Sequence, residues 1–265
     1  MRVIGVVDLA GGRAVHASGG DRERYAPVER VGASAIEPGD SLALARAYTG
    51  PLGLRELYVA DLDAIAGGAV QDARLAALTA LNTPTWVDAG VAAAEQARRV
   101  IDLGAAHVIV GLETLPSFGA LAAICTAVGG GRVAFSLDLR GGRPLTADFF
   151  SGPRDEPAAL AARAADAGAG SVIVIDLARV GGEAGLELRL VDDVRAAVPD
   201  LALVVGGGVR GAEDLRRLAD AGCHAALVAT ALHDGRLGAA EIATSTTARR
   251  PPERAAPGRR CRAGP

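Results

Sequence analysis

The chain of 265 residues contains two copies of one pattern, and this repetition restricts the folds that it can adopt. GVVDLAGGRAV (5–15) and FSLDLRGGRPL (135–145) each read as an apolar strand, Asp-Leu, one residue, Gly-Gly-Arg, one residue and an apolar position. WVDAGVAAAEQARRVIDLGAAHVIVG (86–111) and VVGGGVRGAEDLRRLADAGCHAALVA (204–229) align at an offset of 118 residues (206 − 88). The two halves of the chain are therefore two versions of one unit.

Short β-branched apolar runs alternate with Ala/Leu/Arg-rich stretches of helical period along the whole repeat. The expected strands cover residues 2–8, 56–61, 84–88, 107–111, 132–138, 171–176, 201–206 and 224–229. Near-continuous apolar strands are typical of parallel strands that are buried on both faces. Repeated strand–helix units predict an α/β fold, a (β/α)8 TIM barrel built from two duplicated half-barrels. A doubly wound open sheet is the alternative, but no GxGxxG follows the first strand.

Residues 1–243 carry this pattern and are expected to form one barrel domain, with half-barrels over about 1–129 and 130–243. The last stretch, TSTTARRPPERAAPGRRCRAGP (244–265), is rich in Arg, Pro and small residues and nearly lacks large apolar side chains. Such a composition buries too little apolar surface to order a chain, so we predict a disordered, solvated tail.

Composition excludes several classes of function. The formal net charge of −3 gives no reason to expect nucleic acid or an anionic membrane as a partner. No apolar run approaches the roughly 20 residues that a membrane span requires. All 28 basic residues are Arg, so a Schiff-base lysine and a Walker-type phosphate loop are excluded.

The cysteines and histidines give no indication of a disulfide framework or a metal site. The three cysteines form no CxxC pair, which indicates a reduced, cytoplasmic protein. We expect no metal, because His16, His107, His224 and His233 are not at ligand spacing. We expect no cofactor, because there is no nicotinamide or flavin fingerprint. The expected partner is a small molecule, bound by a monomer or a small homo-oligomer.

The duplication places Asp8 and Asp138 at the C-terminal ends of the first and fifth expected strands. Those strands face each other across a barrel, at the mouth where barrel enzymes keep their chemistry. Two facing carboxylates in different surroundings can supply one general acid and one general base. Each aspartate taken alone could instead cap a helix or tighten a loop, because Asp-x-x-Gly also suits a turn.

DLAGGRAV, DLRGGRPL, YVADLDA and GGGVRGAEDLRRL…ALVATALHDG together resemble the histidine-biosynthesis barrels, and their order and spacing favour the ProFAR isomerase branch. The resemblance covers roughly residues 1–238. It implies an Amadori rearrangement of a phosphoribosyl-amine, with neither metal nor redox cofactor. Asp8 would be the base that removes the proton next to the Schiff-base carbon, and Asp138 the acid that opens the ribose ring.

The family's substrate carries two phosphates, and the resemblance implies one site in each half-barrel. In the second half, amides of a Gly-Gly-Gly run can approach an oxyanion closely because no Cβ intervenes. The phosphate and substrate candidates of both halves are Gly206, Gly207, Gly208, Ala229, Thr230, Gly90, Gly111, His16 and Asp176.

The chain departs from the family at several of these positions. The first-half glycine run reads Asp88-Ala89-Gly90, and Glu113 adds a further negative charge nearby. A carboxylate repels a phosphate, so either the second phosphate is absent from the substrate or Asp88 is turned away. Ile175 and Val180 replace a threonine and an aspartate of the family.

Three functions remain open on these residues. The first is an aldose–ketose isomerase of the ProFAR type, in histidine biosynthesis or acting on a singly phosphorylated sugar or sugar-amine in another pathway. The second is a non-catalytic subunit that binds a phosphorylated ligand. The third is a lyase or epimerase on the same scaffold, because a fold does not fix a reaction.

Overall fold

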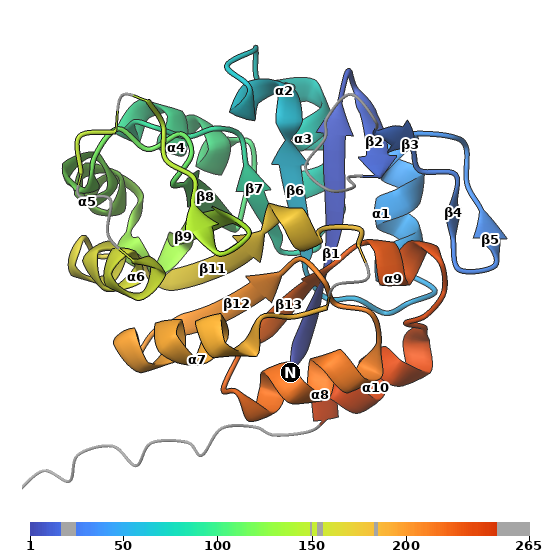
Figure 1. Ribbon diagram of the computed structural model, residues 1–265. Helices are drawn as coiled ribbons and strands as arrows, with labels where there is room; N and C mark the ends of the chain where they lie inside the picture. Colours follow the sequence, from blue (N-terminus) through green and yellow to red (C-terminus); the bar gives the residue numbers. More distant parts are fainter. Residues whose placement is uncertain (17–24, 149, 153–155, 183–184, 248–265) are drawn as a thin grey trace, which may run out of the picture.

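The computed structural model describes residues 1–16, 25–148, 150–152, 156–182 and 185–247 (Figure 1). Its central element is a closed barrel of parallel strands in the order β13-β12-β11-β9-β8-β7-β6-β1, closed by pairing of β1 with β13. The strands are β1 (Arg2–Ala10), β6 (Leu57–Asp61), β7 (Thr85–Asp88), β8 (His107–Gly111), β9 (Val133–Arg140), β11 (Ser171–Asp176), β12 (Ala202–Gly206) and β13 (Ala225–Val228). The predicted (β/α)8 barrel is confirmed.

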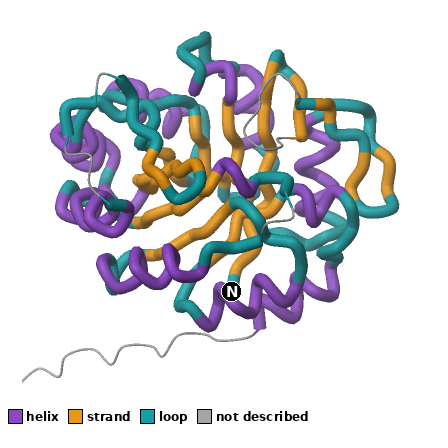
Figure 2. Tube along the Cα trace, in the orientation of Figure 1, coloured by secondary structure: helices purple, strands orange, loops and turns teal. Residues whose placement is uncertain are grey.

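A helix follows every barrel strand and packs on the outside of the barrel (Figures 1 and 2). The outer helices are α1 (Ser41–Thr49), α3 (Asp72–Thr79), α4 (Ala94–Asp102), α5 (Phe118–Val128), α6 (Pro157–Asp166), α7 (Leu188–Ala197), α8 (Ala212–Asp220) and α10 (Ala239–Thr247). Short turns add α2 (Leu62–Ile65), α9 (Thr230–His233), η2 (Gly130–Arg132) and η3 (Leu177–Arg179). Within the described residues, no helix is long and apolar enough to cross a membrane.

Alternate residues of each strand fill two separate cores. One core lies between barrel and helices, where Val3 and Val7 of β1 and Val172 and Val174 of β11 are buried. The other fills the barrel interior, with at least one residue from every strand: Ile4, Tyr58, Ala60, Trp86, Ile109, Ala134, Ile173, Val204, Ala225 and Leu227. Because side chains alternate along a strand, these positions fix which later residues of each strand point inward.

The repeated Gly-Gly-Arg pattern forms a β-hairpin in each half. β1 turns back into β2 (Arg13–His16), with Ala10 paired to Arg13, and β9 turns back into β10 (Arg143–Pro144), with Arg140 paired to Arg143. The two turn glycines have positive φ in both hairpins, 55° and 78° at Gly11 and Gly12 and 59° and 77° at Gly141 and Gly142. Two-residue hairpin turns of this kind require a left-handed backbone, which glycine adopts without strain.

Two further segments complete the described chain. The β1–β2 hairpin is extended by β3 (Ala26–Pro27), and β4 (Arg30–Val31) pairs with β5 (Ser34–Ala35) in a separate ribbon. At the other end of the chain, α10 continues to Thr247, so residues 244–247 of the predicted tail are helical. Residues 248–265 of that prediction lie outside the described residues.

Candidate active site

A cavity of about 380 Å³ opens at the C-terminal ends of the barrel strands. Every barrel strand, or the loop that follows it, contributes to its wall. The charged residues that line it are Asp8, Asp88, Glu113, Asp138, Arg140 and Arg236. A cavity of this size at this end of a barrel is where such proteins bind their small-molecule ligands.

Asp8 and Asp138 face each other across this cavity. Asp8 has the same parity as Ile4 on β1, and Asp138 the same parity as Ala134 on β9, so both side chains point into the barrel. In the closed strand order, β1 and β9 are four strands apart in either direction. The expected opposition of the two carboxyls is therefore the arrangement that the fold produces.

Burial gives Asp8 an unusual protonation equilibrium. Loss of hydration, together with the negative charge of Asp88, raises the pKa of Asp8 to about 7. The strand register explains the coupling, because Asp8 and Asp88 both pair with Ala60 of the intervening β6. A carboxylate with a pKa near neutral is a competent base, since it is ionised in a large part of the molecules and is basic enough to remove a proton.

Asp138 has a side-chain hydrogen-bond partner, and its pKa is also raised. It is 7% exposed, and Ser136 Oγ donates a 2.8 Å hydrogen bond to its Oδ1. Burial, followed by the charges of Glu113 and Asp88, raises the pKa of Asp138 well above its ordinary value, against the opposite effect of the Ser136 hydroxyl. The raised pKa keeps the proton on Asp138 to a higher pH than is usual for an aspartate, as a general acid requires.

The glycine run of the second half lines the cavity, with Gly206 at the end of β12, Gly207 and Gly208 directly after it, and Ala229 and Thr230 after β13. The turn has no room for larger residues. A Cβ on Gly207 would lie 2.8 Å from the Asp176 carbonyl oxygen, and a Cβ on Gly208 2.6 Å from the Gly185 carbonyl oxygen.

Arg236 brings a guanidinium to the cavity, although it is also paired with the exposed Asp234. Glycine amides, a hydroxyl and an arginine are the donors that a phosphate requires.

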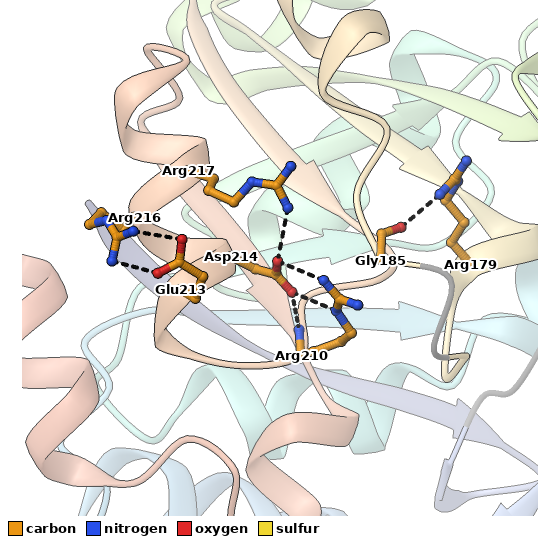
Figure 3. Close-up of polar contacts among 7 residues, drawn as sticks. All are labelled: Arg179, Gly185, Arg210, Glu213, Asp214, Arg216 and Arg217. Carbon is orange, nitrogen blue, oxygen red and sulfur yellow. Dashed lines mark hydrogen bonds and ion pairs between the residues drawn. The ribbon is translucent and has the colours of Figure 1, made fainter.

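Arg210, the arginine of the GGGVR motif, belongs to the support of this turn and does not line the cavity. Its guanidinium donates to both carboxylate oxygens of Asp214, and its backbone N–H also donates to Asp214, at 3.0 Å (Figure 3). The buried Asp214 also attracts Arg217, 3.7 Å away. These contacts tie the loop that ends at Gly211 to the first turn of α8.

His16 and Asp176 do not line the cavity, and each has a local partner. His16 Nε2 lies 2.9 Å from Thr230 Oγ1, so the histidine contacts a cavity residue from behind. Asp176 has the parity of Val174, on the outer face of β11, and accepts hydrogen bonds from the amides of Gly141 and Gly142 at 2.9 and 3.0 Å. It holds the β9–β10 hairpin, and a direct substrate contact of Asp176 stays a prediction.

Gly90 and Gly111 also lie behind the cavity wall. A Cβ on Gly90 would lie 2.8 Å from the Ala64 carbonyl oxygen. A Cβ on Gly111 would lie 3.2 Å from Asp138 Oδ2, so this glycine leaves room for the acidic side chain. Both glycines leave room for neighbouring groups of the site, and phosphate contact by either one stays a prediction.

Four cavity residues with polar side chains were not predicted from the sequence: Tyr25, Tyr58, Arg140 and Arg236. Tyr58 could have been found, because it shares the inward parity of Ala60, two positions later on β6. Arg140 could have been found in the same way, because it ends β9 with the inward parity of Asp138, whereas Arg236 lies in a loop and carries no periodic signal. In the part of the chain that the structure describes, no group of three or more His, Cys, Asp and Glu side chains could hold a metal ion.

A glycine turn beside two opposed carboxyls, in a cavity at the C-terminal ends of the strands, is the arrangement of a (β/α)8-barrel enzyme. A family model described as "Histidine biosynthesis protein" matches residues 2–238, and the chain belongs to that family.

The relatives of the chain include named isomerases. A protein of Thermus thermophilus is 32% identical over 238 residues, covering 89% of this chain and 96% of the relative. One of Deinococcus radiodurans is 33% identical over 237 residues, covering 89% and 95%. Both are named 1-(5-phosphoribosyl)-5-((5-phosphoribosylamino)methylideneamino) imidazole-4-carboxamide isomerase. An uncharacterised protein of Methanocaldococcus jannaschii is 29% identical over 248 residues, covering 91% and 97%.

Proposed function

We propose that the chain catalyses the aldose–ketose isomerisation of a phosphoribosyl-amine, as the named isomerases of the histidine biosynthesis family do. One observation carries the proposal: two carboxyls oppose each other across the cavity, and both have a raised pKa, that of Asp8 being about 7. An Amadori rearrangement needs this pair, because a proton is given to one atom and removed from another.

The proposed reaction begins at the ribose ring. Asp138 donates its proton to the ring oxygen as the C1–O bond breaks, and the nitrogen lone pair forms the C1=N bond. Asp8 then removes the proton from C2, and the electron pair moves to give an enol-amine. Asp8 returns that proton to C1, while the C2 hydroxyl proton passes to Asp138. Both carboxyls regain their starting states, and the aldose amine has become a ketose amine.

The phosphate of the substrate would be bound by the turn Gly206–Gly208, by Thr230 and by Arg236, which lie together along one side of the cavity. Binding there fixes the ribose relative to the two carboxyls. Such positioning contributes to catalysis because the reacting groups no longer need to find each other.

The decisive experiment is turnover of the aldose amine by the purified protein and by Asp8→Asn and Asp138→Asn. Each substitution should lower kcat by a factor of about 10² to 10⁴, the usual contribution of a general acid or base. Circular dichroism and phosphate affinity should remain those of the wild type. Wild-type protein that folds, binds phosphate and converts no aldose amine would instead support the non-catalytic alternative.

We also propose that the protein acts in the cytoplasm, without metal or redox cofactor, as a monomer or small homo-oligomer. Support comes from the two buried cysteines, Cys125 and Cys223, both of which are free thiols. Buried free thiols suit a reducing compartment. Size-exclusion chromatography with light scattering tests the oligomeric state, and dialysis against EDTA should leave turnover unchanged.

A further inference from the structure

The two half-barrels place a glycine with a left-handed backbone at equivalent positions after strands β12 and β7. Gly208 after β12 and Gly90 after β7 have φ of 88° and 63°. Each glycine also lies against a carbonyl oxygen. A Cβ added to Gly208 would be 2.6 Å from the Gly185 oxygen, and one added to Gly90 would be 2.8 Å from the Ala64 oxygen. The strand register agrees: Asp138, Ile175 and Gly206 form one row across the second half, and Asp8, Ala60 and Asp88 form the matching row in the first. Asp88 therefore stands where the second half has Gly206.

In the first half, the turn after β7 binds a carboxylate of the protein itself, that of Asp88. Asp88 is 7% exposed, and its Oδ1 accepts a 3.2 Å hydrogen bond from the Gly90 amide. Its Oδ2 accepts a 3.2 Å hydrogen bond from the buried Tyr58 hydroxyl. Burial and the neighbouring carboxylates raise the pKa of Tyr58 well above its ordinary value, so the phenol remains a donor. The Asp88 carboxylate therefore occupies the Gly90 N–H, a hydrogen-bond donor of the kind that binds a phosphate.

The residues after β8, the neighbouring strand, also differ from their counterparts after β13. At the offset of 118 residues, Thr230 of the second half corresponds to Leu112 (230 − 118), which is fully buried. The next residue, Glu113, lines the cavity. Compared with the second half, the first half therefore has Asp88 in place of a glycine and Leu112 in place of a threonine. Glu113 adds a second carboxylate. Arg140 also lines the cavity, from the β9–β10 hairpin, and is the cation that a second phosphate would have to use.

We propose that the cavity takes a substrate with a single phosphate, bound at the β12/β13 end, and that the β7/β8 end binds a nitrogen group that donates hydrogen bonds, such as a primary amine or an amidine. This inference rests on the proposed isomerase function and names the substrate class for it. A donor group is matched to Asp88 and Glu113, whereas a second phosphate meets two like charges.

The inference is tested first by the stoichiometry of inorganic phosphate binding, measured by calorimetry. The wild type should bind one phosphate, and Thr230→Val should weaken that site. Asp88→Gly should create a second site, with affinity raised at least tenfold over any second binding in the wild type. Asp88→Asn keeps the side-chain size, and it should give a smaller gain in case Asp88→Gly fails to fold. Glu29→Gln removes the same charge on the exposed surface and should change nothing.

A second phosphate site in the wild type, removed by Arg140→Ala, would overturn the inference. So would phosphate stoichiometry that does not respond to Asp88→Gly or to Asp88→Asn in folded protein.

The second test compares substrates. A phosphoribosyl-amine with one phosphate and a terminal amine should have a kcat/KM at least tenfold above that of the bis-phosphoribosyl compound, and Asp88→Asn should reduce this preference. Efficient turnover of the doubly phosphorylated compound, lost in Asp8→Asn, would refute the inference and leave the isomerase function standing. Single-site phosphate binding with no turnover of either compound would refute the isomerase function and leave the single-phosphate cavity standing.

Discussion

Nε2 of His16 lies 2.9 Å from Oγ1 of Thr230, although 214 positions separate the two residues in the sequence. This contact joins the β1–β2 hairpin to the end of β13. Burial lowers the pKa of His16, against the attraction of Asp234, so the ring is neutral at pH 7. The ring of His233 stands edge-on to it at 5.2 Å, also with a lowered pKa, of about 4. A neutral His16 that donates through Nε2 leaves the Thr230 hydrogen available to a phosphate.

His16→Ala should therefore raise KM about tenfold and change kcat less than about twofold, because one net hydrogen bond of about 1 to 1.5 kcal/mol is lost in binding. His16 acts through Thr230 and is a positioning residue. Steady-state kinetics measure the split, and Thr230→Val should show the same phenotype. His16→Gln, which can keep a donor in place, should recover part of the loss. A fall in kcat at constant KM would contradict this role.

The pH dependence of kcat/KM should show an ascending limb near pH 7, because Asp8 must be ionised to accept a proton and its pKa is about 7. The charge of Asp88 contributes to that raised pKa. Asp88→Asn should consequently move the ascending limb to lower pH, whereas Glu29→Gln should leave it in place. A limb that stays fixed in Asp88→Asn would show that another group titrates.

Asp8 should also lower the stability of the fold at alkaline pH. Its pKa is about 7 in the folded chain and 3.8 in an unfolded one, so the folded state binds more protons between these values and loses stability as the pH rises through the interval. Asp8→Asn removes the buried charge. Its Tm should exceed that of the wild type by about 2 °C or more at pH 8.5, and the two should converge at pH 4. Thermal unfolding at both pH values measures the difference, and an equal gain at both would contradict the titration argument.

Gly208→Ala should unfold more easily by about 1 to 3 kcal/mol, because it forces a side chain into a left-handed backbone. Its Cβ would also lie 2.6 Å from the Gly185 carbonyl oxygen. Gly211 is the matched control in the same loop, since its backbone is extended and nothing lies within 4 Å of an added Cβ. Urea unfolding should show Gly211→Ala close to the wild type. Phosphate binding should weaken in Gly208→Ala only, and equal behaviour of the two variants would argue against a cradle at this turn.

The positions of Asp8 and Asp138 could be predicted from the sequence. The period of a strand fixes which of its side chains point inward, and the repeat places the two aspartates at equivalent strands. The same parity count, applied to Val172 and Val174, would have placed Asp176 on the outer face of β11. The glycines after β12 were also readable, since a run of three glycines before a helix has few uses in a barrel.

The tertiary structure alone decided which partners the side chains at strand ends and in loops contact. Asp88 turns its carboxylate to the Gly90 amide and the Tyr58 hydroxyl, and His16 reaches Thr230 across the closed barrel. Arg236 enters the cavity from the loop after α9, which has no periodic pattern. A strand fixes the direction of its side chains through its own geometry, and so the sequence determines them. A loop side chain takes its direction from partners that only the closure of the barrel brings within reach.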